Sequence, residues 1–387
     1  MATFANRNIN RLNLHSGLLQ LSFNLGGTFS YAFMVKNGLP LPFVFLVVAA
    51  ILVLRFIVRP ILLVVSPQIG LKYTLVVGSI VLALQYVALA QVKGLDAALL
   101  VYILISGIGN VFYWTSFHAI FASLGDDHAR GRQVGFRQAL TAVASIIGPA
   151  AGGVMLTLLG PWAAFGAAGL AALCSTLPLI GVVNPPVAKQ APPGAYSAAR
   201  RGTAIFALDG WIVSASYTAW NLILFLALGQ AFDSYGSALA AAALAGAAGG
   251  YFLGRFIDAG NGRKAVTLFC LVACSMLVIQ ALAGFDPVKV VAVALLGSAV
   301  GGLYIPAMMT AIYNDAKRAP CSLRYQFAAE GGWDAGGIAV CLTAYVLLAH
   351  AIPLQAVLLL ALPGVLLQAV LLRTRYAART RNLSAGQ

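Results

Sequence analysis

The sequence predicts an all-α membrane protein with twelve transmembrane helices. Of its 387 residues, 61% are hydrophobic and only 9% are charged, whereas soluble globular domains carry roughly 25% charged residues. Apolar stretches of about 20 residues, long enough to cross a bilayer as a helix, recur along the whole chain. Helices are expected because backbone groups in lipid must be hydrogen-bonded within their own segment, and no stretch alternates with a period of two.

Each of the twelve apolar stretches is expected to form one membrane-spanning helix. An even number of crossings places both ends of the chain on the same side of the membrane. The stretches lie at 13–35, 41–65, 71–92, 97–122, 133–158, 161–183, 204–229, 235–257, 265–284, 287–312, 326–349 and 352–372.

The basic residues predict which side of the membrane is cytoplasmic. The loops on one side hold only Lys36, Lys93 and Lys289, whereas the loops and termini on the other side hold most of the remaining lysines and arginines. Cytoplasmic loops are enriched in Lys and Arg, so both termini are predicted to be cytoplasmic in a multi-pass protein of the cytoplasmic (inner) membrane. The net charge of +14 follows from this topology, which argues against nucleic-acid binding.

One stretch in the middle of the chain is neither apolar nor long enough to be a domain. Residues 184–203 (NPPVAKQAPPGAYSAARRGT) are rich in proline and basic, a composition typical of linkers. Six apolar stretches lie on either side of it. The sequence therefore predicts an N-terminal six-helix bundle at 1–183, a cytoplasmic linker at 184–203 and a C-terminal six-helix bundle at 204–387, which ends in a short basic tail.

Small residues and a proline recur in the fifth apolar stretch. Small residues let helix backbones approach closely, and a proline removes one helical hydrogen bond and bends the helix. The pattern resembles the antiporter motif of the major facilitator superfamily, with alanine at one position where glycine is usual; tight packing of a general kind is the alternative explanation. The residues are Gly135, Ala144, Gly148, Pro149, Gly152 and Gly153.

A second resemblance to this family lies between the eighth and ninth stretches. The residues there resemble the family's signature cytoplasmic loop, with one residue more than usual between the aspartate and the second glycine. A carboxylate at this place can interact with a helix N-terminus while the basic pair anchors the loop. The residues are Gly254, Asp258, Gly262, Arg263 and Lys264.

The first half departs from the family pattern. Its copy of the signature loop keeps Gly70 and Lys72, but Pro67 stands where aspartate is expected and Leu63 where glycine is expected. In the fourth stretch, Ile103 occupies the position at which proton-driven drug exporters often carry an arginine. The resemblance therefore implies the fold of a twelve-helix antiporter or efflux-type facilitator, with a degenerate first-half loop.

Two arginines interrupt the second apolar stretch. Arg55 and Arg59 are one helical turn apart and share a face, and ionisable residues inside a span are costly enough to suggest a function. Three interpretations are open: both snorkel towards the interface, Arg55 binds an anionic substrate, or the arginines form a cytoplasmic gate with Glu330 and Asp334. The family resemblance implies that the second and eleventh helices face each other, as the gate requires.

Other charged residues are candidates for gating or for coupling to protons. Arg137 in the fifth stretch and Asp209 in the seventh lie within about two helical turns of the predicted cytoplasmic face, where each is either a gate partner or an interfacial charge. Asp258 belongs to the signature loop. Carboxylates that face a partly dry cavity take up protons near neutral pH, so Asp209, Glu330 and Asp334 are the candidates for proton coupling.

Uncharged polar and aromatic residues form stripes on four of the stretches. The family resemblance implies that the first, fourth, seventh and tenth helices line the substrate cavity, although hydrogen bonding between helices also explains polar residues in spans. Aromatic rings with amide donors suit an organic molecule. Besides Arg55, the substrate-binding candidates are Gln20, Asn24, Tyr31, Asn110, Tyr113, Trp114, Tyr217, Trp220, Asn221 and Tyr304.

These observations predict a secondary transporter that moves a small organic solute by alternating access, coupled to protons, with export by antiport favoured. Proton-coupled uptake of an organic anion bearing a carboxylate or phosphate is the alternative, and a receptor or scaffold that does not transport is the alternative of another class. No nucleophile–base set, zinc motif or phosphate-binding loop points to an enzyme. We expect no cofactor and no metal, a monomer, and solute, protons and lipid as the only partners.

Overall fold

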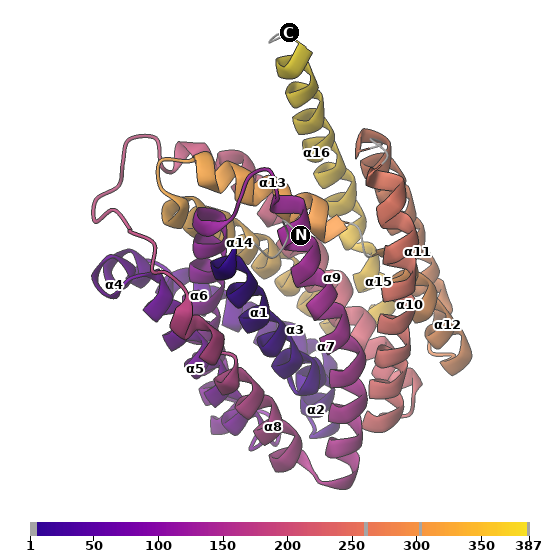
Figure 1. Cartoon of the computed structure of the whole chain (residues 1–387). Helices are drawn as coiled ribbons and strands as arrows, with labels where there is room; N and C mark the ends of the chain where they lie inside the picture. The colour runs from indigo at the N-terminus through magenta and orange to yellow at the C-terminus, as the bar shows by residue number, and fades with distance from the viewer. Residues whose placement is uncertain (1–5, 259–261, 302–303, 385–387) are drawn as a thin grey trace.

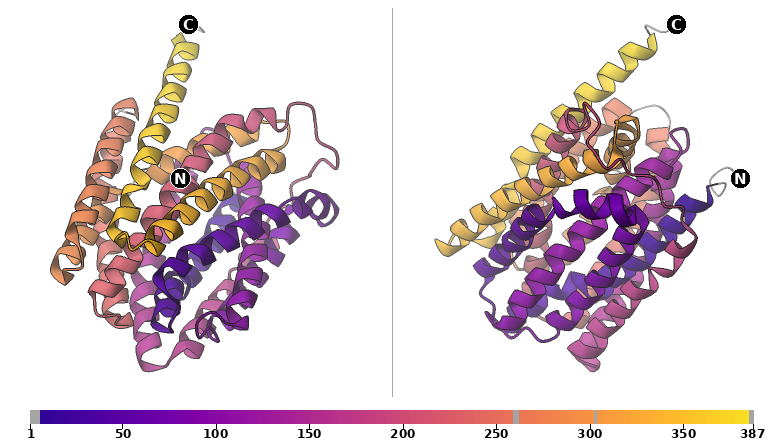
Figure 2. Two further views of the ribbon diagram at one scale, coloured as in Figure 1. Left: turned by 180° about the vertical axis from the view of Figure 1, so that it is seen from behind. Right: turned by 90° about the vertical axis from the view of Figure 1, so that its left-hand side faces the viewer.

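The computed structural model describes residues 6–258, 262–301 and 304–384, with the side chains of 249–266, 269, 300–307 and 374–384 left out of the description. Every regular element in these ranges is a helix (Figure 1). The helices run roughly along one another, and the second half of the chain lies beside the first in all views (Figure 2). This agrees with the predicted all-helical class.

The elements before the central linker begin with a broken helix, because the 3-10 turn η2 separates α1 from α2. They are α1 (Arg7–Leu25), η2 (Gly27–Phe29), α2 (Ser30–Lys36), α3 (Leu41–Val58), α4 (Ile61–Ile69), α5 (Leu71–Leu89), α6 (Ala97–Leu124), α7 (Arg130–Leu158), α8 (Pro161–Cys174) and η3 (Leu177–Gly181).

The elements after the linker start at the 3-10 turn η4. They are η4 (Ser197–Ala199), α9 (Arg200–Ala227), α10 (Phe232–Asp258), α11 (Gly262–Ala283), α12 (Pro287–Gly301), α13 (Tyr304–Arg318), α14 (Ser322–Ala349), α15 (Leu354–Leu359) and α16 (Ala361–Ser384).

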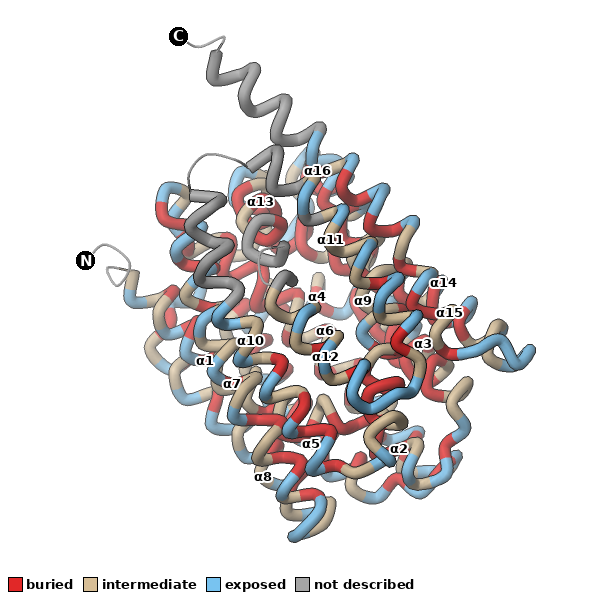
Figure 3. The backbone as a smooth tube through the Cα atoms, turned by 90° about the vertical axis from the view of Figure 1, so that its right-hand side faces the viewer, coloured by how far each residue is buried: buried red, intermediate tan, exposed pale blue. Residues whose placement is uncertain are grey.

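Eight helices of the described chain are long and apolar enough to cross a membrane, and two shorter apolar helices lie at Cys270–Ala283 and Pro287–Ala299. Large apolar side chains such as Leu158, Leu282 and Val288 are more than two-thirds exposed, as expected of faces that contact lipid rather than water. Buried residues follow the opposite helix faces (Figure 3). The count of twelve spans and the side on which the termini lie stay predictions.

The predicted second span, 41–65, is not one continuous helix. α3 ends at Val58 and α4 begins at Ile61, with Pro60 between them. Proline lacks the backbone N–H that would continue the helical ladder, and its ring clashes with the preceding turn. Arg59 therefore sits at the end of α3, where its backbone N–H still bonds to the Arg55 carbonyl.

The connection between η3 and η4 is tied to both parts of the chain. The side chain of Asn184 accepts a hydrogen bond from the Lys72 backbone N–H of α5 at 3.1 Å. Arg324 of α14, which is buried, donates to the carbonyls of Ala188 at 2.9 Å and Lys189 at 3.0 Å. The predicted linker is thus anchored to a helix of each part, and its last four residues, 200–203, belong to α9.

The glycine-rich stretch of α7 lets three helices approach closely. A Cβ added to Gly148 would lie 2.5 Å from the Asn24 Cβ of α1, and one added to Gly153 would overlap the Phe232 carbonyl of α10. From the other side, Gly236 of α10 faces the Pro149 carbonyl in the same way. α7 and α10 belong to opposite sides of the linker, so this seam joins the two parts.

We predict that Gly153→Ala lowers the stability of the protein by about 1–3 kcal/mol, the usual range for overpacking a tight contact. Gly166→Ala is the matched control, because Gly166 lies on the exposed face of α8 with no atom within 4 Å of an added Cβ. Alanine has the higher helix propensity, so the control should unfold at the same or a higher temperature. Thermal unfolding of both purified variants tests this, and equal midpoints for the two would contradict the close contact.

Candidate functional site

Four charged side chains meet between α3 and α14. Arg55 Nη2 lies 3.0 Å from Glu330 Oε2, and Arg55 Nε lies 3.1 Å from Asp334 Oδ1. Arg59 forms an ion pair with the other oxygen of Asp334. None of the four residues is more than 6% exposed. Two cations and two anions thus compensate one another in an interior that would otherwise penalise each of them heavily.

The local sequence explains why these groups meet. Each pair is separated by four residues, so each lies on one face of its helix. α14 can come close to its neighbours because it carries glycines at the contacts: an added Cβ on Gly337 would lie 2.5 Å from Leu52 of α3, and one on Gly336 would overlap the Ala207 carbonyl of α9. Glycine pairs follow both Glu330 and Asp334 in the sequence, and they are a signal from which this close approach could have been predicted.

Two residues of α6 extend the charge cluster. Thr115 accepts a hydrogen bond from Arg59 Nη1 at 3.2 Å. His118 lies with Nε2 3.4 Å from Glu330 Oε1 and with Nδ1 2.6 Å from the Tyr313 hydroxyl of α13. The imidazole also stacks on Trp114, with ring centroids 5.4 Å apart. A carboxylate of α14 is therefore connected through His118 to α13.

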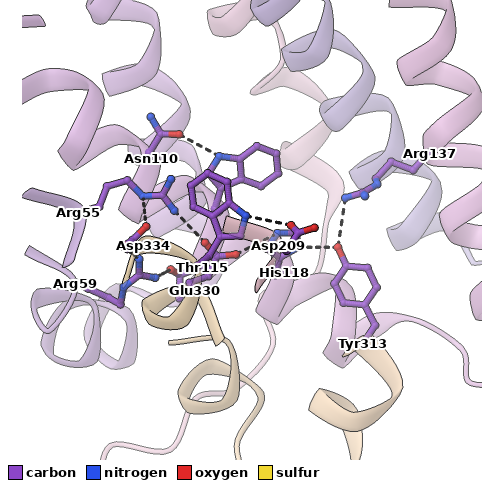
Figure 4. Close-up of polar contacts among 12 residues, drawn as sticks. Arg55, Arg59, Asn110, Thr115, His118, Arg137, Asp209, Tyr313, Glu330 and Asp334 are labelled. Carbon is purple, nitrogen blue, oxygen red and sulfur yellow. Dashed lines mark hydrogen bonds and ion pairs between the residues drawn. The ribbon is translucent and has the colours of Figure 1, made fainter. Parts of the chain in front are cut away.

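The chain of contacts ends at Arg137 of α7. Its Nη1 lies 3.3 Å from the Tyr313 hydroxyl, and its guanidinium carbon lies 5.6 Å from the centre of the Phe117 ring. We call these connected residues the polar belt; Figure 4 shows it crossing between helices from both sides of the linker. The polar belt comprises Arg55, Arg59, Thr115, His118, Arg137, Tyr313, Glu330 and Asp334.

Arg137 and Glu330 of the polar belt lie at similar depths in the bundle. Arg137 is seven residues from the start of α7, and Glu330 is eight residues from the start of α14. At 1.5 Å per residue both lie about 10–12 Å from the helix ends that are predicted to be cytoplasmic. Closer to that end, Arg130 Nε donates to Asn314 at 3.2 Å, and Lys317 donates to the Gly125 carbonyl at 2.6 Å. These contacts also join the two parts of the chain.

Asp209 of α9 lies beside the polar belt rather than in it. Its Oδ2 accepts a hydrogen bond from the Trp333 indole at 3.1 Å, and the Trp333 ring lies 5.2 Å from the Arg55 guanidinium carbon. Both Asp209 and Trp333 come after the linker. Asp209 therefore positions the ring that packs on Arg55. No sequence pattern predicts this contact, because Trp333 is neither charged nor part of a polar stripe.

The predicted lining of the seventh stretch divides into two environments. The amide of Asn221 is used inside the protein: it donates to the Tyr217 carbonyl at 2.8 Å and accepts from the Tyr235 hydroxyl at 2.7 Å. Tyr217 is 50% exposed, and its hydroxyl interacts with Thr28 of η2. Trp220 is partly buried and packs against the apolar core that includes Phe225 and Tyr235. Tyr217 thus lies between α9 and η2, whereas Asn221 links α9 to α10 through its hydrogen bond with Tyr235.

The remaining candidates of the first and fourth stretches are placed as follows. Trp114 donates to Asn110 at 3.0 Å, and Asn24 donates to the Gln20 carbonyl at 2.8 Å. Tyr113 is fully buried beside Phe117 and His15. Partial exposure is shared by Gln20, Asn24, Tyr31, Asn110 and Trp114. Asp258 and Tyr304 lie outside the residues whose side chains are described.

The sequence of the chain matches the family model of the Major Facilitator Superfamily over residues 16–340. The chain belongs to this superfamily. Membership agrees with the helical fold and indicates a multi-pass membrane transporter rather than an enzyme. No curated protein sequence matches the chain.

Solved structures of other facilitators share the fold at low sequence identity. The human organic anion transporter MFSD10 aligns with a TM-score of 0.64 and 19% identity, over 95% of this chain and 99% of its own. The fucose:proton symporter FucP of E. coli aligns at 0.64 and 14%, over 95% and 98%. A structure of FucP in the outward conformation aligns at 0.68 and 14%, over 95% and 98%. At these identities the comparison shows the fold alone.

We predict that Asp334→Asn destabilises the protein by about 3–5 kcal/mol, because it leaves the buried Arg59 without an anion and Arg55 with Glu330 alone. The control is Asp286→Asn, an exposed residue whose Oδ1 accepts from the backbone N–H groups of Val288 and Lys289. Asparagine keeps that helix cap. Thermal unfolding of both variants measures the difference. An Asp334 variant as stable as the wild type would contradict the prediction, because it would show that water solvates the charges of this cluster.

Proposed function

We propose that this facilitator is a secondary active transporter that moves a small organic solute by alternating access, in exchange for protons and in the direction of export. The observation that carries the proposal is the set of ion pairs by which Arg55 and Arg59, before the linker, hold Glu330 and Asp334, after it. In facilitators the substrate site lies where the two halves meet, so a bond across that boundary is placed to control access.

The ion pairs suit a gate because their strength depends on water. In a dry interior the four charges need one another, and separating them would be strongly unfavourable. When the two parts move apart at this end, water enters and solvates each charge, which compensates for most of the lost attraction. Closed and open states can therefore be similar in free energy. We assign Arg55 and Arg59 to the gate rather than to substrate binding.

Glu330 is the residue we propose for coupling to protons. It contacts both Arg55 and His118, so protonating its carboxylate removes the anion that each of them faces. Arg55 would then be held by Asp334 alone. Proton uptake thereby weakens the gate without breaking it, and release restores the closed state.

Four helices supply the proposed solute contacts. Gln20, Asn24 and Tyr31 come from α1 and α2, Trp114 from α6 and Tyr217 from α9, and all five side chains are at least partly exposed. The close backbone contact of Gly153 and Gly236 joins α7 and α10, and the resemblance of this stretch of α7 to the antiporter motif is what favours exchange. Uptake of an organic anion is the second candidate, and buried Arg137 favours it.

Flux into proteoliposomes tests the function directly. We expect an imposed pH gradient to drive accumulation of at least one solute in a panel of anionic, neutral and cationic compounds, above the level of protein-free liposomes. If solute flux is stimulated when the side opposite to the solute is the acidic one, protons and solute are exchanged. If flux is stimulated when the solute's own side is acidic, the two are co-transported. Absence of gradient-driven flux across the panel would contradict the proposal.

Charge reversal tests the gate. We predict that Arg55→Ala and Arg55→Glu each reduce flux at least tenfold, because both break the pair with Glu330, and that Arg55→Glu combined with Glu330→Arg recovers part of it. Recovery is expected to be partial because Arg55 also contacts Asp334. Arg132→Glu, an exposed arginine at the same end, is the control for charge alone. A double variant as inactive as its single parents would refute the pairing.

A further inference from the structure

Arg137 is a buried cation without a carboxylate partner. It is 7% exposed, and among the residues whose side chains are described no Asp or Glu lies within ion-pair distance of it. Its neighbours are the Tyr313 hydroxyl and the face of Phe117, and its Nε has no hydrogen-bond partner. Leaving a guanidinium in this state is unfavourable, in contrast to the compensated charges of Arg55 and Arg59.

A second polar group without a well-formed hydrogen bond lies near Arg137. Tyr113 of α6 is fully buried and interacts electrostatically with Arg137, and its hydroxyl lies near the Ser16 hydroxyl of α1, at a geometry too poor for a standard hydrogen bond. Its ring stacks on Phe117 at 5.7 Å and meets the Trp114 ring edge-on at 4.8 Å. The Arg137 Nε–H and the Tyr113 hydroxyl, neither of which has an acceptor at good hydrogen-bond geometry, thus lie together inside an aromatic cluster.

We propose that Arg137 and Tyr113 bind the carboxylate of an aromatic organic acid, which is the solute that this transporter moves. The guanidinium supplies paired N–H donors that match the two oxygens of a carboxylate, and the phenol supplies a further O–H donor. The surrounding rings of Phe117 and Trp114 offer apolar and stacking contacts to an aromatic body. This inference rests on the proposed function and names its substrate class.

The placement of the partners explains how such a site opens. Arg137, Tyr113 and Phe117 belong to α6 and α7, before the linker, whereas Tyr313 belongs to α13, after it. In the closed arrangement the Tyr313 hydroxyl occupies one donor of Arg137. Movement of α13 away from α7 frees that donor and exposes the guanidinium, so an entering carboxylate takes the place of Tyr313. The bound anion also balances the one arginine of the polar belt that Glu330 and Asp334 do not compensate.

The test measures binding of benzoate to the purified full-length protein by thermal unfolding. Benzamide, which has the same shape without the charge, and sodium chloride at equal ionic strength are the controls. A ligand that binds only the folded state raises its stability by RT ln(1 + [L]/Kd), so the midpoint should rise with benzoate concentration in the wild type and not with benzamide. The concentration dependence gives an apparent affinity for each variant.

Three variants separate a binding role from a structural one. Arg137→Gln should weaken benzoate binding at least tenfold, and exposed Arg132→Gln on the same helix should leave it unchanged. Tyr113→Phe keeps the ring and removes a hydroxyl whose only hydroxyl neighbour, Ser16, is not at good hydrogen-bond geometry, so the ligand-free midpoint should change little, because at most one weak hydrogen bond is lost. Its affinity for benzoate should nevertheless fall several-fold, which a purely structural tyrosine would not cause.

Failure of this inference is distinct from failure of the proposed function. The inference is overturned if benzoate does not stabilise the wild type, if benzamide stabilises it equally, or if Arg137→Gln and Tyr113→Phe keep the wild-type affinity. If gradient-driven flux of a neutral or cationic solute is then observed, the transporter function stands and only the assignment of an aromatic acid is wrong. If no solute moves, the proposed function fails as well.

Discussion

Arg55, Arg59, Glu330 and Asp334 hold one another in an interior that offers them no water. Each group is acceptable there only because the others are present. The geometry of α3 against α14 is therefore fixed by the requirement that Arg55 meets Glu330 at 3.0 Å and Asp334 at 3.1 Å, although both carboxylates lie more than 270 residues away along the chain. Hydrophobic packing alone tolerates small displacements of one helix along another. A set of buried ion pairs does not, and it gives this boundary a defined register.

The helix that carries the two carboxylates, α14, also packs closely against two neighbouring helices through its glycines. α14 lies between α3 and α9 (Figures 1 and 2), with Gly332 and Gly336 against α9 and Gly337 against α3. Backbone contact of this kind fixes the distance between helices, whereas the carboxylates fix their position along the axis. Trp333, held by Asp209, then covers the Arg55 guanidinium from the α9 side.

The sequence predicted the parts of this site that depend on helical periodicity and on the cost of burying charge. The spacing of Arg55 to Arg59 and of Glu330 to Asp334 placed each pair on one face, and the family resemblance brought the faces together. It did not determine which charge meets which, because that depends on how far α14 is shifted along α3. Nor did it predict Tyr313, Thr115 or the bond between Asn221 and Tyr235, since an uncharged polar residue in a span fits a cavity wall and an interhelical hydrogen bond equally well. The break at Pro60 was readable from the residue itself.

The anchored connection between the two parts has a mechanical consequence. Asn184 is tied to α5 and Ala188 to Arg324 of α14, and the residues between these points are Pro185, Pro186 and Val187. Consecutive prolines favour an extended, stiff backbone of about 3.1 Å per residue, so the segment spans about 12 Å and resists both stretching and collapse. While both bonds hold, the segment keeps its two anchor points on α5 and α14 at a nearly constant separation, so the two parts open at this end by pivoting about it.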